Sequence, residues 1–565
     1  MAPDPEQPTL SSLGKVGKSS GEIGGVEEPL LNGGIHTSEN YSLSSAIFPG
    51  IGLLLNEEGE KVAFGYGETV KKNKRRKLYA VKGKEGEGLV REVMISMLTL
   101  NTFYDHLEFC HLFLFPALGG LLYGYDIGST SCATISIQSA TSSGISWYNL
   151  NSVDIGLITS GSLYGALIGS VLAFNIADFL GRRRELILAA FLYLVGALVT
   201  ALAPAFAVVV IGRFVFGIGI GLAMHAAPMY IAETAPSPIR GQLISLKEFF
   251  IVLGMVGGYG IGSLLVDTVA GWRYMYVAST PLAVIMGIGM WWLPASPRWL
   301  LLRAIQGKGS MLELRETAIC CLCRLRGDAI GDTAPAKVDE ILAELAVVGE
   351  EKEVTLTEVF RGKCLKALTI GAGLVLFQQI TGQPSVLYYA ASILQSAGFS
   401  AASDATRVSI LIGLFKLIMT GTAVLVVDRL GRRPLLLGGV SGMVISLFLL
   451  GSYYIFLDNA PVVAVVALLL YVGCYQLSFG PIGWLMISEI FPLRLRGRGL
   501  GIAVLVNFGA NALVTFTFSP LKALLGAGIL FYAFGVIAVL SLLFIIFIVP
   551  ETKGLTLEEI EAKCL

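Results

Sequence analysis

The strongest constraint in this chain is a series of apolar runs, each long enough to cross a lipid bilayer. A membrane-spanning helix needs about 20 mainly apolar residues, and such runs recur from Phe113 onward. They form two groups of six, at 113–134, 154–176, 185–203, 206–228, 243–265 and 273–293, and at 367–390, 408–427, 434–456, 461–487, 499–521 and 527–549. Hydrophobic residues make up 54% of the 565 residues and charged residues 15%, which excludes an ordinary soluble or disordered chain. The sequence therefore predicts an all-α membrane protein with twelve transmembrane helices in two six-helix halves.

The remaining segments are polar and give a division of the chain. We expect a cytosolic N-terminal tail (1–111), an N-terminal six-helix half (112–295), a cytosolic linker with amphipathic helices (296–364), a C-terminal six-helix half (365–550) and a cytosolic C-terminal tail (551–565). In the linker, the apolar residues between Val338 and Val348 recur at helical spacing, which is typical of a surface helix.

Arginine residues orient the chain in the membrane. Loops that face the cytosol carry an excess of lysine and arginine, and the loops after the even-numbered runs are rich in arginine whereas the opposite loops have almost none. Both termini are therefore expected on the cytosolic side of a multi-pass membrane protein.

The two groups of runs repeat one another in their loop charges. After the second run the chain reads Asp-Phe-Leu-Gly-Arg-Arg, and after the eighth it reads Asp-Arg-Leu-Gly-Arg-Arg. After the fourth and tenth runs a glutamate stands seven residues before Arg-Gly. We expect these charges to form a gate that joins the two halves; the alternative is that the arginines only set topology. The candidate gate residues are Asp178, Arg182, Arg183, Glu233 and Arg240, with Asp428, Arg432, Arg433, Glu489 and Arg496. Such matched clusters are typical of a transporter built from pseudo-symmetric parallel repeats.

Four further motifs, together with these repeats, carry a family resemblance. They are Pro294-Ala-Ser-Pro-Arg298, Gln378-Gln379-Ile-Thr-Gly382, Gly480-Pro-Ile-Gly-Trp484 and Pro550-Glu-Thr-Lys-Gly554. With them the chain over 113–560 resembles the sugar porter branch of the major facilitator superfamily (MFS), most closely its plant vacuolar glucose transporter and xylose–proton symporter-like group. The resemblance implies the MFS fold and proton-coupled transport of a monosaccharide, of the glucose or xylose type, by alternating access. The alternatives are a facilitative uniporter and a sugar sensor that does not transport.

Other classes of function find no support in the sequence. It contains no nucleophile–base, metal-ligand or phosphate-binding pattern, so we expect no enzyme, cofactor or metal. The formal net charge of zero gives no reason to expect nucleic acid as a partner. The expected partners are the sugar, protons and the lipid bilayer, with a monomer as the transport unit.

Two ionisable residues lie deep within the apolar runs. Asp126 lies about thirteen residues into the first run and Arg213 lies in the fourth. A carboxylate at that depth costs roughly 2.5–3.5 kcal/mol and is usually functional. The resemblance implies that Asp126 accepts the proton and Arg213 modulates its affinity; the alternative is a permanent structural ion pair.

Polar and aromatic residues in the second half predict a sugar site. A sugar needs amides that donate and accept hydrogen bonds, beside an aromatic plate. The candidates are Gln378, Gln379, Asn507 and Asn511, with Trp484 as the plate. The resemblance adds Tyr388 and Tyr389 as an aromatic pair that closes the outer side of the site.

Two positions depart from the family pattern. Glu248 stands where many members have a sugar-contacting glutamine; we expect it to bind sugar or titrate, or alternatively to pair with a nearby Lys or Arg. Gln383-Pro384 replaces Ile-Asn, so Gln383 is a candidate replacement amide, and proline predicts a break in the seventh run.

The N-terminal tail carries two further hypotheses. Residues 50–111 interrupt what would be a short entry into the first run, and we interpret them as an insertion such as a retained intron; the alternative is a polybasic tail that binds anionic lipid. Glu27-Glu28-Pro29-Leu30-Leu31 resembles an acidic dileucine sorting signal. The vacuolar membrane is therefore the favoured location, with plastid and plasma membrane as alternatives.

Overall fold

The computed structural model describes residues 113–235, 240–326, 333–350, 360, 362–399, 401–456, 460–491 and 496–553, and the backbone of three strands nearer the N-terminus. The strands are β1 (Ser42–Ser44), β2 (Ile51–Leu55) and β3 (Lys61–Gly65). They form one antiparallel sheet in the order β1-β2-β3, with Leu43 opposite Leu54 and Leu54 opposite Val62. This sheet belongs to a separate compact unit, Met1–Asp105. The sequence analysis predicted no strands in this region.

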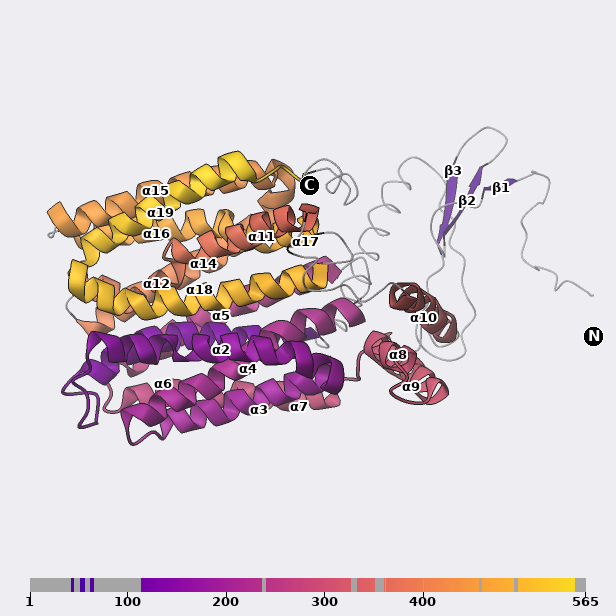
Figure 1. Ribbon diagram of the computed structural model, residues 1–565, viewed down its shortest axis with the longest axis horizontal. Coiled ribbons are helices and arrows are strands. Elements are labelled where there is room, and N and C mark those ends of the chain that lie inside the picture. The colour runs from indigo at the N-terminus through magenta and orange to yellow at the C-terminus, as the bar shows by residue number, and fades with distance from the viewer. Residues whose placement is uncertain are drawn as a thin grey trace, which may run out of the picture. The chain divides into compact units, whose positions relative to one another are not determined.

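The rest of the described chain is helical (Figure 1). The first helix covers 113–138. The first half continues with α2 (Ser152–Leu180), α3 (Arg182–Ala201), α4 (Phe206–Thr234), α5 (Arg240–Leu265), α6 (Gly271–Val277) and α7 (Thr280–Trp292). The second half contains α11 (Gly362–Ile380), α12 (Gln383–Tyr388), α13 (Ala390–Ser396), α14 (Ala402–Leu430), α15 (Arg432–Phe456), α16 (Pro461–Leu477), α17 (Phe479–Ile490), α18 (Arg496–Leu525) and α19 (Ala527–Ile548). Within the described residues, eleven helical segments after the first helix are long and apolar enough to cross a membrane, which confirms the predicted runs.

Some spans are broken, and the break in the seventh span has a clear cause in the sequence. Helix α11 ends at Ile380, and Gly382 adopts a left-handed φ of 94° before α12 begins. Pro384 stands in the first turn of α12, where its missing N–H is not needed. The expected break is therefore confirmed, and the proline starts the new helix.

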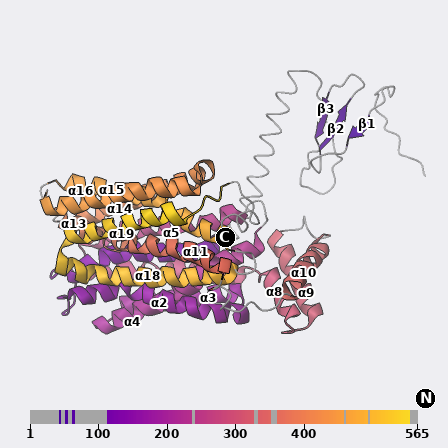
Figure 2. The same cartoon turned by 45° about the horizontal axis from the view of Figure 1, so that its top comes forward.

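The two halves pack against each other along α2 and α18 and along α5 and α14 (Figures 1 and 2). Within the first half, glycines allow the helix backbones to approach closely, as is common in membrane bundles. A Cβ at Gly217 of α4 would overlap the backbone carbonyl of Ser162 on α2. This close approach brings Arg213, one turn earlier in α4, against the first helix and α2.

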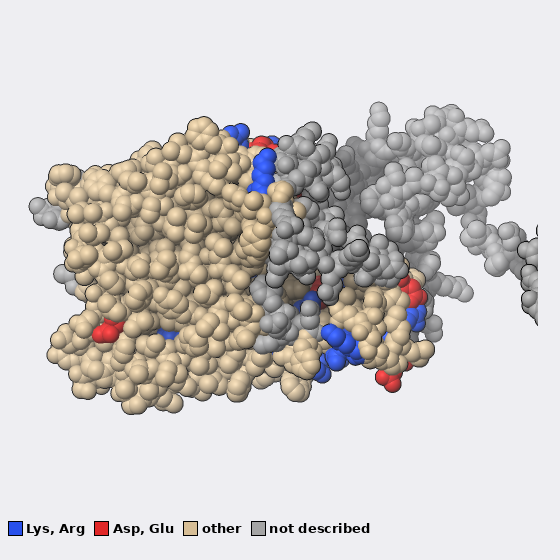
Figure 3. All heavy atoms as spheres, viewed as in Figure 1, with Lys and Arg blue, Asp and Glu red and all other residues tan. Residues whose placement is uncertain are grey.

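Three short helices follow the first half: α8 (Pro297–Ile305), α9 (Met311–Arg326) and α10 (Ala334–Glu350). They share a small core that includes Trp299, Leu322 and Val338, while Asp339 of α10 is exposed and pairs with Arg315 at 2.7 Å. On the visible face, charged side chains gather on these helices and at the adjoining ends of the long helices, and few appear on the bundle itself (Figure 3). We call the membrane face that carries α8–α10 the linker side, and the other face the opposite side.

Candidate functional site

Asp126 and Arg213 form an ion pair that is almost completely buried. The exposed fractions of their side chains are 2% and 1%, and Nη1 of Arg213 donates to Oδ1 of Asp126. Ser162 of α2 joins both partners: its hydroxyl donates to Oδ2 of Asp126 (2.9 Å) and accepts from Nη2 of Arg213 (3.0 Å). Nε of Arg213 also donates to the carbonyl of Ile158 (3.1 Å). The sequence-predicted pair is thus brought together, with a serine that the sequence analysis did not single out.

A small cavity adjoins this pair. It measures about 10 Å³ and is lined by Ser129, Thr200 and Ser279 as well as by Asp126 and Arg213. The lining also includes apolar side chains such as Ala197 and Phe216. This volume is about the size needed for one water molecule, which the polar side chains of the lining suit as hydrogen-bond partners. The Asp126 carboxyl therefore lies next to a space that fits a single water molecule.

Two of the predicted sugar-binding amides bond to each other in the second half, and a third is bonded beside them. Nε2 of Gln379 donates to Oδ1 of Asn507 (2.6 Å), and Nε2 of Gln378 donates to the carbonyl of Phe479 at the start of α17 (3.0 Å). The side-chain oxygens of Gln378 and Gln379 are buried and have no hydrogen-bond partner among the described residues. Because buried acceptors are normally satisfied, these two oxygens are suited to accept hydrogen bonds from a ligand with hydroxyl groups.

The other predicted sugar-binding residues surround these amides less directly. Trp484 is half-buried on α17, six residues after the break at Ser478, and Gln383 is half-buried at the start of α12. Asn511 lies one turn after Asn507 in α18 and accepts a hydrogen bond from Thr515 (3.3 Å). Glu248 on α5 has a half-exposed side chain 3.6 Å from Lys247, which matches the pairing alternative.

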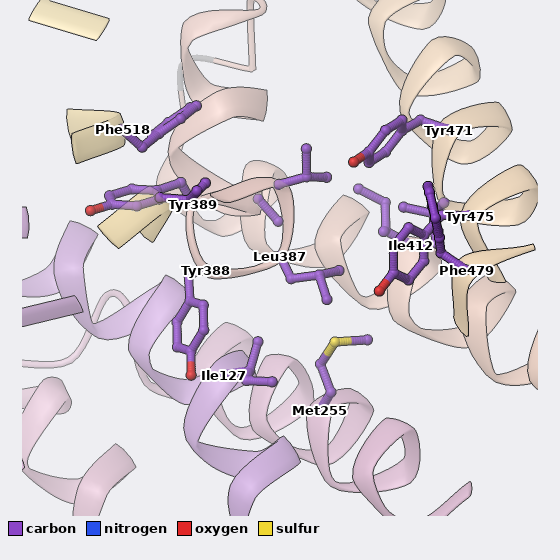
Figure 4. Packing of buried hydrophobic residues seen from close by; sticks show 14 of the residues in the cluster. Ile127, Met255, Leu387, Tyr388, Tyr389, Ile412, Tyr471, Tyr475, Phe479 and Phe518 are labelled. Carbon is purple, nitrogen blue, oxygen red and sulfur yellow. The ribbon is translucent and has the colours of Figure 1, made fainter. Parts of the chain in front are cut away.

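The two halves are joined on the opposite side, around α12. Tyr388 and Tyr389 are buried (Figure 4), and the hydroxyl of Tyr389 donates to the carbonyl of Thr515 (3.1 Å). The ring of Tyr388 extends toward Ile127 of the first helix (Figure 4). Tyr259 of α5 donates to the carbonyl of Leu387 across the two halves (2.7 Å). The aromatic pair is thus placed in the packed contact between the halves.

On the linker side, two arginine–glutamate pairs each lie within one half. Arg182 pairs with Glu233 (3.0 Å), and Arg432 pairs with Glu489 (2.9 Å). The first pair joins α3 to α4, and the second joins α15 to α17. In each pair the glutamate and the arginine therefore belong to the same repeat. The sequence analysis expected pairs between the halves, and these two pairs are instead within a half.

The next arginine of each repeat fastens the last helix of the same half. Arg183 donates to the carbonyls of Met290 and Trp291 at the end of α7, and Arg433 donates to the carbonyl of Ile546 at the end of α19 (2.7 Å). The side chains of Asp178, Arg240, Asp428 and Arg496 lie outside the described residues, so the gate that the sequence predicts between the halves remains a prediction.

Glu551 gives the Pro550-Glu-Thr-Lys-Gly554 motif a structural role. Its carboxylate accepts from the backbone N–H groups of Arg432 (3.1 Å) and Arg433 (2.9 Å) at the start of α15. The pKa of Glu551 is lower than its usual value. Partial burial alone would raise it, but hydrogen bonds from the backbone of Lys553, Arg432, Arg433 and Thr552 stabilise the carboxylate and have the larger combined effect. The motif therefore ties the end of the bundle to α15.

Two buried ionisable residues were missed by sequence reasoning. Lys416, in the middle of α14, is 7% exposed, with its ammonium 6.0 Å from the ring centre of Tyr475. Glu185 near the start of α3 is fully buried and lies 3.0 Å from His225. A charge inside or beside an apolar run is the signal that could have identified both.

This geometry defines a class of protein. Two helical repeats are joined on one membrane side, a buried carboxylate–guanidinium pair lies in the first repeat, and acceptor-rich amides lie in the second. These features are those of a secondary transporter in which two halves move around a central site.

The chain belongs to the sugar transporter family, since the family profile described as "Sugar (and other) transporter" matches residues 112–563. It is 69% identical to the "D-xylose-proton symporter-like 2" protein of Arabidopsis thaliana over the full length of both chains. It is 64% identical to "D-xylose-proton symporter-like 3, chloroplastic" of the same plant, over 80% of this chain and 82% of that one.

The fold is that of a known transporter. The inward-open structure of the xylose transporter XylE from E. coli matches with a TM-score of 0.66 and 31% identity, over 80% of this chain and 98% of that one. The structure of the proton:xylose symporter XylE bound to 6-bromo-6-deoxy-D-glucose has the same TM-score at 32% identity, over 81% of this chain and 99% of that one. The predicted twelve-helix MFS fold is thereby confirmed.

Proposed function

We propose that this protein is a proton-coupled transporter of monosaccharides, of the xylose or glucose type, that works by alternating access. The observation that carries the proposal is the buried pair of Asp126 and Arg213, placed one helical turn from Tyr123, which in turn lies near Asn511 and Tyr388. A proton on Asp126 weakens its attraction to Arg213, and the first helix transmits that change toward the sugar-binding amides.

The described contacts suit one stage of the cycle. The halves are joined on the opposite side by Tyr259 and Leu387 and by Ala391 and Ser131. With the linker side in the cytosol, as the arginine distribution predicts, this arrangement corresponds to a cytosol-facing conformation, like the inward-open XylE structure that the chain matches.

The energy available through Asp126 is sufficient for accumulation. One proton that crosses about 100 mV supplies about 2.3 kcal/mol, and one pH unit adds about 1.36 kcal/mol. At one proton per sugar, these two contributions support roughly 500-fold accumulation. The direction of sugar movement then depends on the membrane and its gradients.

The test is reconstitution of the full chain in proteoliposomes, with a panel of radiolabelled pentoses, hexoses and polyols and an imposed pH gradient. We expect uphill uptake of at least one aldopentose or aldohexose and a matching alkalinisation on the side that supplies the protons. Sugar flux that never exceeds equilibration and moves no protons would identify a uniporter. Saturable sugar binding with no flux would identify a sensor.

We further propose that the protein resides in the vacuolar membrane as a monomer. The support is the acidic dileucine-like segment that ends at Leu30-Leu31, whereas one relative carries the word chloroplastic in its name. A fluorescent fusion in plant cells tests the location: we expect vacuolar signal that Leu30→Ala with Leu31→Ala redirects. Plastid or plasma-membrane signal from the unaltered chain would contradict the proposal.

A further inference from the structure

Lys416 is a buried cation that the proposed cycle does not yet use. It lies at the middle of α14, a helix of 29 residues, and its side chain is 7% exposed. A lysine at the centre of a membrane helix costs roughly 2.5–3.5 kcal/mol and usually has a partner. Among the described residues, no carboxylate lies within 4.0 Å of its ammonium, which lies 6.0 Å from the ring centre of Tyr475 on α16. The structure therefore holds a buried charge without an ion pair in this conformation.

Among the described residues, Glu248, on α5 of the other half, lies close enough to Lys416 for their charges to attract each other. Glu248 is also close enough to influence Tyr475 electrostatically. The carboxylate, the ammonium and this tyrosine therefore lie in the same region of the protein. Helices α5 and α14 pack against each other between the two halves. The two charges therefore face the same boundary between the halves from opposite sides.

The register of α5 against α14 shows how far apart the two groups lie along the membrane. A Cβ at Gly413 would lie 3.1 Å from Val256 and 3.2 Å from Tyr259, so these residues mark one level. Toward the linker side, Lys416 is three residues beyond Gly413, and Glu248 is eight residues beyond Val256. At 1.5 Å per residue, Glu248 lies roughly 7 Å nearer the linker side than Lys416. The long side chains of lysine and glutamate can cover that offset when the helices come together.

In this conformation Glu248 is turned to a different cation. Its carboxylate lies 3.6 Å from Lys247, and 42% of its side chain is exposed. The halves are joined on the opposite side, by Tyr259 to Leu387 and by the N–H of Ala391 to Ser131. Closure of the linker side would bring α5 and α14 together near Glu248 and expel the water that now solvates it.

We propose that Glu248 and Lys416 form an ion pair between the two halves when the linker side closes, with Glu248 exchanging Lys247 for Lys416. The pair rests on the proposed alternating-access function and adds to it a contact specific to the closed state. The pair neutralises Lys416 in the conformation in which solvent is excluded. Both residues then act as positioning residues that hold α5 and α14 together when the linker side closes.

The test is a charge-neutralisation cycle on the full chain in proteoliposomes, measured as counterflow of the sugar that the unaltered protein transports best. We expect Glu248→Gln and Lys416→Met each to reduce counterflow at least tenfold, because each leaves one charge without its partner during closure. The double variant should recover to within threefold of the unaltered protein, which a merely structural role for either side chain would not produce. The matched control is Asp404→Asn with Arg407→Met, an exposed pair on the same helix (3.5 Å), which should change nothing.

The outcomes separate this inference from the function on which it rests. If the unaltered chain moves no sugar, the proposed function fails and the pair fails with it. If it transports, and the double variant is no faster than the slower single variant, only the pair is refuted. Monodisperse elution in detergent checks folding. Should Lys416→Met not fold, the charge exchange Glu248→Lys with Lys416→Glu replaces it, and a rate no higher than that of Glu248→Lys alone overturns the pair.

Discussion

Replacement of Asp126 by asparagine is the sharpest test of proton coupling. The substitution preserves shape and leaves an oxygen for Arg213, but it removes the only carboxylate described in contact with that guanidinium. Breaking a buried ion pair by removing one partner costs about 3–5 kcal/mol. Since Arg213 keeps its bonds to Ile158 and Ser162, we expect a loss near 3 kcal/mol.

The functional effect should be selective. Without a titratable group, the roughly 500-fold accumulation available from about 100 mV and one pH unit should fall to simple equilibration. Counterflow of sugar, which needs no net proton movement, should continue. Both are measured in the same proteoliposomes, with radiolabelled sugar inside or outside and a pH-sensitive dye.

A companion variant separates coupling from stability. Asp126→Asn with Arg213→Met removes both charges, so much of the lost thermal stability in detergent should return while accumulation stays absent. Accumulation by Asp126→Asn at the level of the unaltered protein would refute the assignment of the proton site. Loss of both accumulation and counterflow in a folded Asp126→Asn protein would show that the pair serves structure rather than coupling.

Two further predictions concern the bundle. Gly382→Ala should lower the free energy of unfolding by about 1–3 kcal/mol, because φ is 94° and the new Cβ would lie 2.8 Å from the ring of Phe534. The control is Gly421→Ala, in a helix with open space around it, which should be neutral or stabilising. An equal loss in both variants would contradict this account. At pH values above about 4.3, the carboxyl pKa of an unfolded chain, Glu551→Gln should have a lower melting temperature than the unaltered protein. Because the folded pKa is lowered, this difference should disappear as the pH falls through that lowered value, and a difference that persists in acid would argue against the carboxylate as the fastening group.

The sequence predicted the helices better than it predicted the contacts of charged residues. Apolar runs set the spans because lipid demands about 20 residues of internally bonded backbone, and Pro384 correctly indicated the break at α12. The Asp126–Arg213 pair could be predicted because each is a rare charge at membrane depth. The partners of Arg182 and Arg432 could not, since repeat spacing is the same whether an arginine binds its own half or the other. Lys416 went unnoticed because a single charge hardly changes the mean hydropathy of a long run.

The arginines that bind the ends of α7 and α19 have a mechanical consequence. Arg183 and Arg433 hold the last helix of each half to the first turn of the helix in which they lie, so neither fastening needs to open when the halves rock. The moving parts are then two preassembled blocks, and covalent continuity between them is not required for motion. A chain interrupted between α10 and α11, expressed as two pieces, should reassemble into a working transporter.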